Sequence, residues 1–101
     1  MSERAYEAVE LARKTGKIKK GANEVTKAIE RGTAKFVVYA KDVTPPEITM
    51  HLPLLCKDKG VPFAEVPSKD ELGAAAGLPI GTVAIAIVSE GEAKGILKEL
   101  R

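Results

Sequence analysis

The segment Val83-Ala84-Ile85-Ala86-Ile87-Val88 decides the fold prediction, because it is the most apolar run in the sequence. An unbroken apolar run rich in β-branched residues is typical of a strand that is buried on both faces of a sheet. We therefore place this strand in the centre of the sheet. The run Phe36-Val37-Val38-Tyr39-Ala40 predicts a second buried strand, and residues 61–66, with Pro62 near their start, predict a third.

Helix signals surround these strands. The predicted helices run from Ser2 as N-cap to about Lys14, from about Asn23 to Arg31, from Thr44-Pro45-Pro46-Glu47 to Gly60, from Ser68 to about Ala76, and from about Glu90 to Leu100. Pro53 is expected to break or restart the third helix, and residues 17–20 are read as a short basic stretch. This alternation predicts an α/β fold, a three-layer α/β/α sandwich with a small mixed four-stranded sheet. Residues 1–101 are expected to form a single domain.

The charge of the chain is unevenly distributed. Of 101 residues, 16 are Lys or Arg and 14 are Asp or Glu, so the net charge is only +2. Residues 13–41, however, hold nine basic and two acidic residues, a net of +7. This asymmetry indicates either a face for a polyanion or a helix surface that is simply rich in lysine. A single cysteine, no signal peptide and no apolar run long enough for a membrane span together predict a cytoplasmic protein.

The residue types of an enzyme site are poorly arranged in this sequence. His51 and Cys56 are five residues apart, which places them about 140° apart on an ideal helix. No two-histidine or Cys-x-x-Cys spacing is present for a metal, and neither the Walker loop nor the dinucleotide glycine motif occurs. We therefore expect no enzyme, no metal and no cofactor.

The most informative stretch runs from Lys19 to Gly32. Gly21 leads into a helix N-terminus, whose free backbone N–H groups can hold phosphate oxygens. Asn23 and Glu24 can hydrogen-bond base edges, and Lys27 can donate to guanine on the same side of the helix. The alternative is that Asn23 merely caps the helix and Glu24 merely suits its dipole. Spacing alone leaves both interpretations open.

Several separated segments resemble the archaeal ribosomal protein L7Ae family. They are Gly-Ala-Asn-Glu-Val-Thr-Lys-Ala-Ile-Glu-Arg-Gly at 21–32, Asp42 followed by Pro45-Pro46-Glu47-Ile48, His51-Leu52-Pro53-Leu54-Leu55-Cys56, and Ser68-Lys69-Asp70-Glu71-Leu72-Gly73. The match covers about residues 15–92 without a gap. Members of this family bind kink-turn RNA, in which tandem sheared G·A pairs sharply bend the duplex.

The resemblance implies an RNA-binding protein that recognises and stabilises kink-turns and nucleates ribonucleoprotein assembly. Family members act in the large ribosomal subunit and as the first-bound protein of box C/D and H/ACA guide ribonucleoproteins, and archaeal members are associated with ribonuclease P. The implied partners are therefore ribosomal RNA, guide RNA, ribonuclease P RNA and ribonucleoprotein core proteins, bound by a monomer. Two alternatives remain: a paralogue that binds ribosomal RNA only, and a small nucleotide-binding enzyme that uses the helix N-terminus at Gly21.

The resemblance also implies roles for individual residues. It assigns Asn23, Glu24 and Lys27 to the edges of the sheared G·A bases, Gly21 to close backbone approach, and Lys20 and Arg31 to phosphates. It places Asp42 near Lys27, where a charge pair would orient the lysine.

Two further contacts with the RNA follow from the same resemblance. Ile48 corresponds to the pocket for a flipped-out nucleotide. Leu78, Ile80 and Val83 belong to a second RNA-contacting loop that covers the protruding nucleotide. The alternative for Leu78 and Val83 is that they only anchor a turn. This loop departs from the Ser-Arg-Pro version of many members, which affects the choice among kink-turns.

Overall fold

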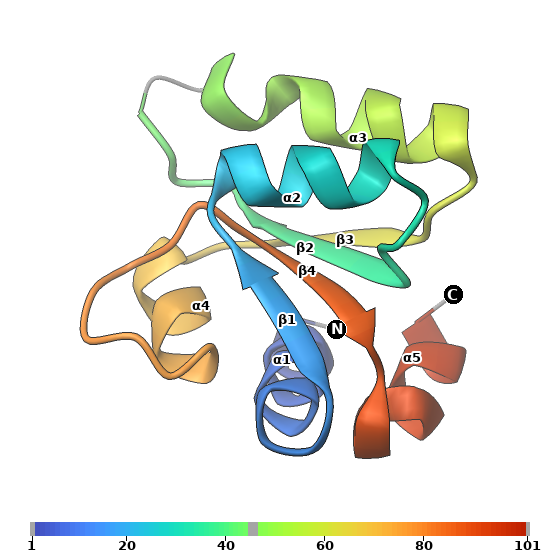
Figure 1. Ribbon diagram of the computed structural model, residues 1–101. Helices are drawn as coiled ribbons and strands as arrows, with labels where there is room; N and C mark the ends of the chain where they lie inside the picture. The colour runs from blue at the N-terminus through green and yellow to red at the C-terminus, as the bar shows by residue number, and fades with distance from the viewer. Residues whose placement is uncertain (1, 45–46, 101) are drawn as a thin grey trace.

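A computed structural model of the protein describes residues 2–44 and 47–100, with the backbone alone at residues 2, 47 and 48 (Figure 1). The strands are β1 (Lys17–Lys20), β2 (Phe36–Ala40), β3 (Phe63–Val66) and β4 (Ala84–Ser89). The α-helices are α1 (Ser2–Thr15), α2 (Ala22–Glu30), α3 (Glu47–Lys59), α4 (Lys69–Ala75) and α5 (Lys94–Leu100), the last preceded by the 3-10 turn η1 (Gly91–Ala93).

The four strands form one mixed sheet in the order β1-β4-β2-β3. β4 is antiparallel to both of its neighbours, and β2 and β3 are parallel. The expected mixed four-stranded sheet is therefore confirmed, with the segment after Val83 in its interior. β4 lies inside the sheet and its side chains enter the cores on both faces, so all but its last residues are buried.

β1 corrects the interpretation of residues 17–20 as a basic stretch. Three of its four residues are lysines, yet Lys20 pairs opposite Ile85 and Ile18 opposite Ile87. β1 lies at the edge of the sheet, where one side of the strand is solvated and where lysines discourage pairing with another chain. An edge strand can therefore have a composition that an internal strand cannot.

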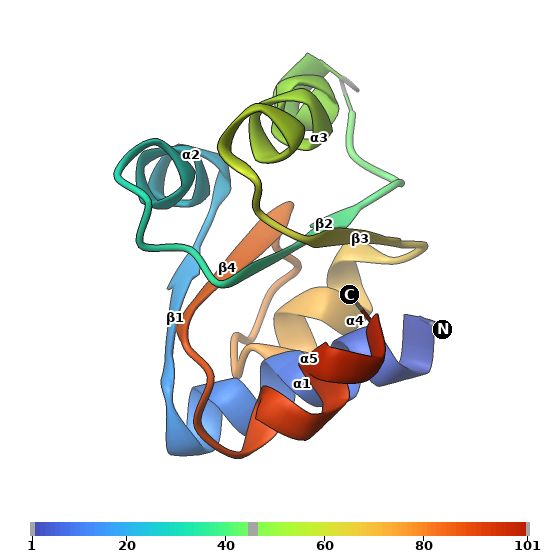
Figure 2. The same ribbon diagram turned by 90° about the vertical axis from the view of Figure 1, so that its right-hand side faces the viewer.

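The helices cover both faces of the sheet, so the predicted three layers are confirmed. Figures 1 and 2 show α2 and α3 on one face and α1, α4 and α5 on the other. Alternate side chains of β2 and β4 serve the two cores, with Phe36 and Ile85 packed toward α1 and Val37 and Ala84 packed toward α2 and α3. Among the described residues, no helix is long and apolar enough to cross a membrane.

The third and the last predicted helices differ in detail from those observed. The last one, predicted from about Glu90, begins as the 3-10 turn η1 and becomes the α-helix α5 only at Lys94. α3 continues through Pro53 without the expected break. Proline removes one backbone donor and disfavours the preceding turn, but Leu52 and Cys56 are fully buried beside it, and this packing holds the helix together. The proposed start at Thr44-Pro45-Pro46 lies partly outside the described residues, as does the side chain of Ser2.

The predicted start of α4 is confirmed by its cap. The Ser68 Oγ accepts a hydrogen bond from the backbone N–H of Glu71 at 3.2 Å, which satisfies one of the free donors of the first turn.

The strand directions bring three loops together at one edge of the sheet. β1 and β2 both end where β4 begins, because each is antiparallel to it. The Gly21 N–H donates to the Ala84 carbonyl at 3.0 Å, and the Ala40 N–H donates to the Val83 carbonyl at 2.9 Å. The first turn of α2, residues 41–44 and the loop 78–83 consequently meet at this edge.

The central position of β4 predicts a large effect of truncation there. We expect Ile85→Ala to lower the free energy of unfolding by about 2–5 kcal/mol, because Ile85 is fully buried and a cavity would remain. Ile80→Ala is the matched control, since Ile80 is 73% exposed and its loss should cost less than about 0.5 kcal/mol. Equal losses in chemical denaturation would contradict this assignment of the core.

Candidate nucleic-acid interface

Gly21 starts the candidate site in a conformation that suits glycine. Its φ is +91°, in the region that side chains with a Cβ rarely adopt, and it is the N-cap of α2. A Cβ at this position would meet no atom of the protein within 4 Å. The glycine is therefore required by the backbone turn, and the space in front of it is open to a ligand.

The helix that follows leaves its first polar side chains exposed. Because Gly21 is the N-cap and forms no side-chain cap bond, Asn23 does not cap the helix. The alternative reading of Asn23 as an N-cap is therefore wrong. Asn23, Glu24 and Lys27 are all exposed, while Val25 and Ile29 are fully buried against the sheet. The helix thus presents an amide, a carboxylate and an ammonium group to solvent.

Glu24 and Lys27 form an ion pair across one turn of α2. The Lys27 Nζ lies 3.8 Å from the Glu24 Oε1, and about half of each side chain is exposed. Exposed pairs of this kind contribute little to stability. The two charged groups are therefore held side by side but remain free to exchange this contact for one with a ligand.

The expected pair between Asp42 and Lys27 does not form in the structure. The Asp42 Oδ1 instead accepts a hydrogen bond from the backbone N–H of Lys69 at 2.8 Å. This bond ties the loop after β2 to the start of α4, so Asp42 serves the fold here and Glu24 is the partner of Lys27.

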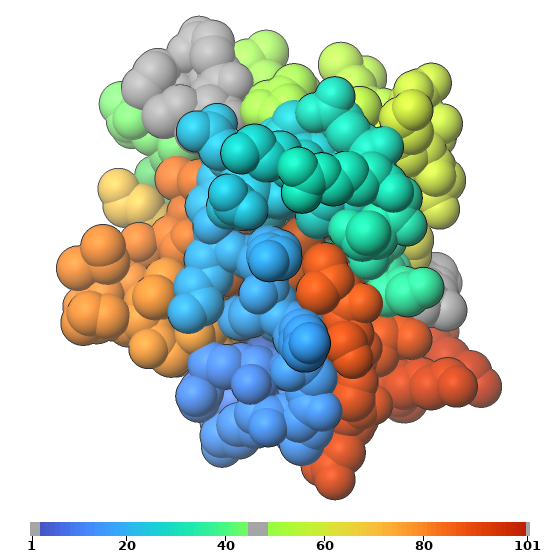
Figure 3. Space-filling view, viewed as in Figure 1, coloured from blue at the N-terminus to red at the C-terminus, as the bar shows by residue number. Residues whose placement is uncertain are grey.

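Exposed cations lie on both sides of these three residues. Lys20 ends β1 directly before Gly21, and Arg31 follows the last turn of α2 as its C-cap. Together with Lys17, Lys19 and Lys27, they form a basic strip on β1 and α2, all of it exposed. Figure 3 shows β1 and α2 as one continuous band on the surface. Part of the charge excess of residues 13–41 thus lies on β1 and α2.

The apolar side chains of the loop before β4 are of two kinds: two pack against the core and one is exposed. Leu78 and Val83 are half-buried and pack against the core, so they anchor the loop, and their contact with RNA stays a prediction. Ile80 is 73% exposed. The loop is held on α4 by the Thr82 N–H, which donates to the Lys69 carbonyl at 3.0 Å, and by close approach of the Ile80 carbonyl to Gly73, where any Cβ would collide with it.

The remaining predicted site residue is Ile48. Its backbone lies in the first turn of α3, at the edge of the sheet where α2 also begins, but its side chain lies outside the described atoms. The prediction of a nucleotide pocket at Ile48 therefore stays a prediction.

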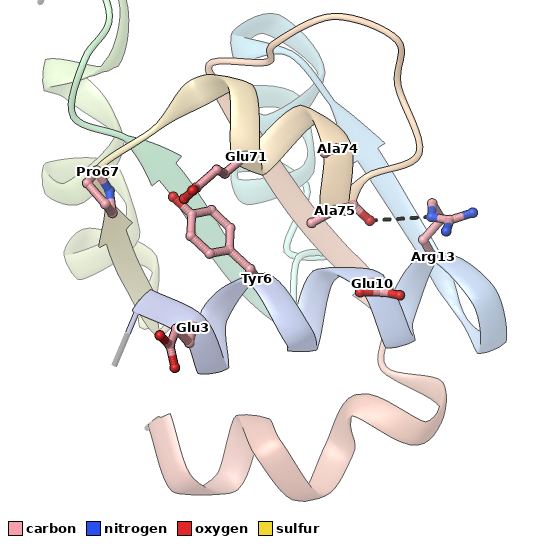
Figure 4. Close-up of a pocket in the computed structure, with 8 residues that line it drawn as sticks. All are labelled: Glu3, Tyr6, Glu10, Arg13, Pro67, Glu71, Ala74 and Ala75. Carbon is pink, nitrogen blue, oxygen red and sulfur yellow. Dashed lines mark hydrogen bonds between the residues drawn. The ribbon is translucent and has the colours of Figure 1, made fainter.

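A hollow on the other side of the sheet has the wrong charge for a polyanion. It is a cavity of about 600 Å³ between α1 and α4, and Figure 4 shows Glu3, Glu10 and Glu71 around it. Among the described residues that line it, Arg13 is the one cation, and its Nε donates to the Ala75 carbonyl at 3.3 Å. Three carboxylates repel phosphate, so the basic strip is the better candidate for a nucleic acid.

The sequence matches a known family over nearly its whole length. The model of the ribosomal protein L7Ae/L30e/S12e/Gadd45 family covers residues 3–97. The chain belongs to this family.

A solved structure agrees with this assignment to the L7Ae family. The "Giardia lamblia 15.5kD RNA binding protein" is 36% identical, with a TM-score of 0.92 over 98% of this chain and 82% of that one. The family is one of ribosomal proteins and the structural relative is an RNA-binding protein, so the expectation of a non-enzymatic protein is confirmed.

Cys56 and His51, the two residues considered for catalysis, both make contacts that stabilise the fold of this L7Ae-family chain. Cys56 is fully buried, and burial raises the pKa of its thiol to about 11. His51 is exposed, and its Nε2 lies 2.8 Å from the Thr26 Oγ1 on α2. This contact could not be predicted from the sequence, because Thr26 and His51 are 25 residues apart and lie on different helices.

The raised pKa of Cys56 predicts an unreactive thiol. At pH 8 the native protein should be alkylated by iodoacetamide at least about 100-fold more slowly than the guanidinium-unfolded chain, since burial disfavours both the thiolate and its access to reagent. Mass spectrometry of the quenched reaction measures both rates. Labelling of the native protein at the unfolded rate would show that Cys56 is accessible.

Proposed function

We propose that this chain binds RNA and that it recognises and stabilises kink-turn motifs in ribosomal RNA and guide RNAs, thereby nucleating ribonucleoprotein assembly. The observation that carries the proposal is the exposed set Asn23, Glu24 and Lys27. These residues follow the N-cap Gly21, which has a positive φ angle and open space in front of it. Membership in the L7Ae family and likeness to an RNA-binding protein support the RNA as partner. The ribosomal role would place the protein in the cytoplasm.

The exposed side chains of Asn23, Glu24 and Lys27 on α2 fit base edges better than phosphates alone. An amide can donate and accept at one base, a carboxylate accepts from an amino group, and an ammonium donates to guanine O6 or N7. A purely electrostatic strip would gain nothing from Glu24. The three side chains together favour readout of purine edges such as those that sheared G·A pairs expose.

Phosphate contacts then set the orientation of the RNA. The free N–H groups at the start of α2 carry partial positive charge. Because the N-cap Gly21 has no side chain, no cap covers them. Lys20 lies on one side of this turn and Arg31 at the far end of the helix. In the same proposal Ile80, and Ile48 from α3, cover the unpaired nucleotides, while Leu78 and Val83 support the loop from below.

The proposed mechanism is a shift of the RNA population. RNA that samples extended and kinked forms presents the G·A edges and the flipped base only in the kinked form. A protein that binds this form alone draws the equilibrium toward it.

Two alternatives are separated by simple measurements. A role confined to ribosomal RNA would give tight binding to a ribosomal kink-turn and no binding to box C/D or H/ACA guide RNA. A nucleotide-binding enzyme would bind mononucleotides tightly at the Gly21 turn, which NMR titration would detect. The family and the lack of a catalytic set near Gly21 among the described residues favour the RNA-binding reading.

Base readout by Asn23 predicts a loss that depends on the RNA. We expect Asn23→Ala to weaken binding to a kink-turn RNA by about 1–3 kcal/mol and to leave binding to a plain duplex unchanged. Gel shifts at one fixed salt concentration measure both affinities. Equal losses on the two RNAs would exclude Asn23 from base readout.

Phosphate binding by Lys20 predicts a different signature. Lys20→Ala should weaken binding to all RNAs about evenly and reduce the slope of log affinity against log salt by about one. Lys98→Ala is the matched control, because Lys98 is an exposed lysine on α5 at the opposite face of the sheet. A Lys98→Ala variant with the same reduction would mean that the lysines act through net charge alone.

A further inference from the structure

The first turn of α2 has no side-chain cap. Its N-cap is a glycine with no side-chain hydrogen bond, so nothing at the cap holds the free N–H groups. This leaves those groups open to a ligand. Residues that position this turn must therefore act from elsewhere.

Thr26 supplies one such contact from inside the helix. Its Oγ1 lies 2.7 Å from the carbonyl oxygen of Ala22, the first residue of α2. A carbonyl can only accept, so the single hydroxyl proton of Thr26 is donated to Ala22. The oxygen of the same hydroxyl keeps its capacity to accept a bond.

His51 of α3 occupies that acceptor. Its Nε2 lies 2.8 Å from the Thr26 Oγ1. Because the hydroxyl proton is already used, the hydrogen between these two atoms must belong to His51 Nε2. A continuous chain of hydrogen bonds thus runs from the His51 ring through Thr26 to Ala22, the residue between Gly21 and Asn23.

We infer that His51 is a positioning residue for the RNA-reading turn of α2, which it holds from α3 through the Thr26 hydroxyl and the Ala22 carbonyl. This inference rests on the proposed function. Figure 1 shows α2 and α3 side by side on one face of the sheet, and Ile48 lies in the first turn of α3. The link therefore joins the helix that would read the bases to the helix that would hold the flipped nucleotide.

The first test needs no RNA. In a long-range ¹H–¹⁵N spectrum of the wild-type protein at about pH 8, His51 should carry its proton on Nε2, with Nδ1 unprotonated. Thr26→Val, which removes the hydroxyl at nearly constant shape, should shift the Nε2 resonance, whereas Thr26→Ser should retain it. A proton on Nδ1, or a spectrum that Thr26→Val leaves unchanged, would overturn the inference.

Hydrogen exchange reports the effect on the turn itself. The Val25 N–H donates to the Gly21 carbonyl at 3.0 Å in the first turn of α2. His51→Ala should speed exchange of this amide about fivefold, and His51→Gln, whose amide N–H can replace the donor, should restore the wild-type rate. An exchange rate that both variants leave unchanged would show that His51 does not hold the turn.

The binding test uses a double-mutant cycle. His51→Ala and Thr26→Val should each weaken binding to a kink-turn RNA about fivefold, and the double variant should lose no more than either single variant. His51→Gln should bind within about twofold of wild type. Multiplied losses in the double variant would mean that the two residues act separately and would contradict the relay. If wild type does not prefer the kink-turn at all, the proposed function fails, while the spectral and exchange tests still decide the link.

Discussion

The antiparallel pairing of β4 with both β1 and β2 is the constraint on which the rest of the structure depends. It makes β1 and β2, the two neighbours of β4, end where β4 begins. The loops that leave these two strands must therefore share one edge of the sheet. The apolar pattern of β4 fixes this arrangement, because a slip of one residue would exchange Ile85 and Ile87 with the alanines that face the other core. The location of the first turn of α2 is therefore a consequence of how the sheet is packed.

The fold also separates charges that the net value of +2 conceals. The basic strip lies on β1 and α2, whereas the hollow lined by Glu3, Glu10 and Glu71 lies between α1 and α4 on the other face of the sheet. Of the nine cations in residues 13–41, Arg13, Lys14, Lys35 and Lys41 lie outside the strip, and the first two of these bond to Ala75 and Glu10. The surface available to RNA is thus defined by the placement of cations and not by their number.

Sequence predicts those features whose cause is local or periodic. The strands β2 and β4, the Ser68 cap and the buried face of α2 follow from apolar runs, capping chemistry and helical spacing. β1 could not be predicted, because its lysines are tolerated only at a sheet edge, which is a tertiary fact. The same holds for the continuity of α3 at Pro53, for Asp42 bonding to Lys69, and for the contact between His51 and Thr26, each of which depends on packing between distant segments.

The central claim is that this L7Ae-family chain reads the G·A edges of a kinked RNA with the first turns of α2. Its most direct test is the affinity of the wild-type protein, at one fixed salt concentration, for a kink-turn RNA and for a copy whose G·A pairs are converted to G·C. We expect the kink-turn RNA to bind more tightly by about tenfold or more. Equal affinity for the two RNAs would contradict it.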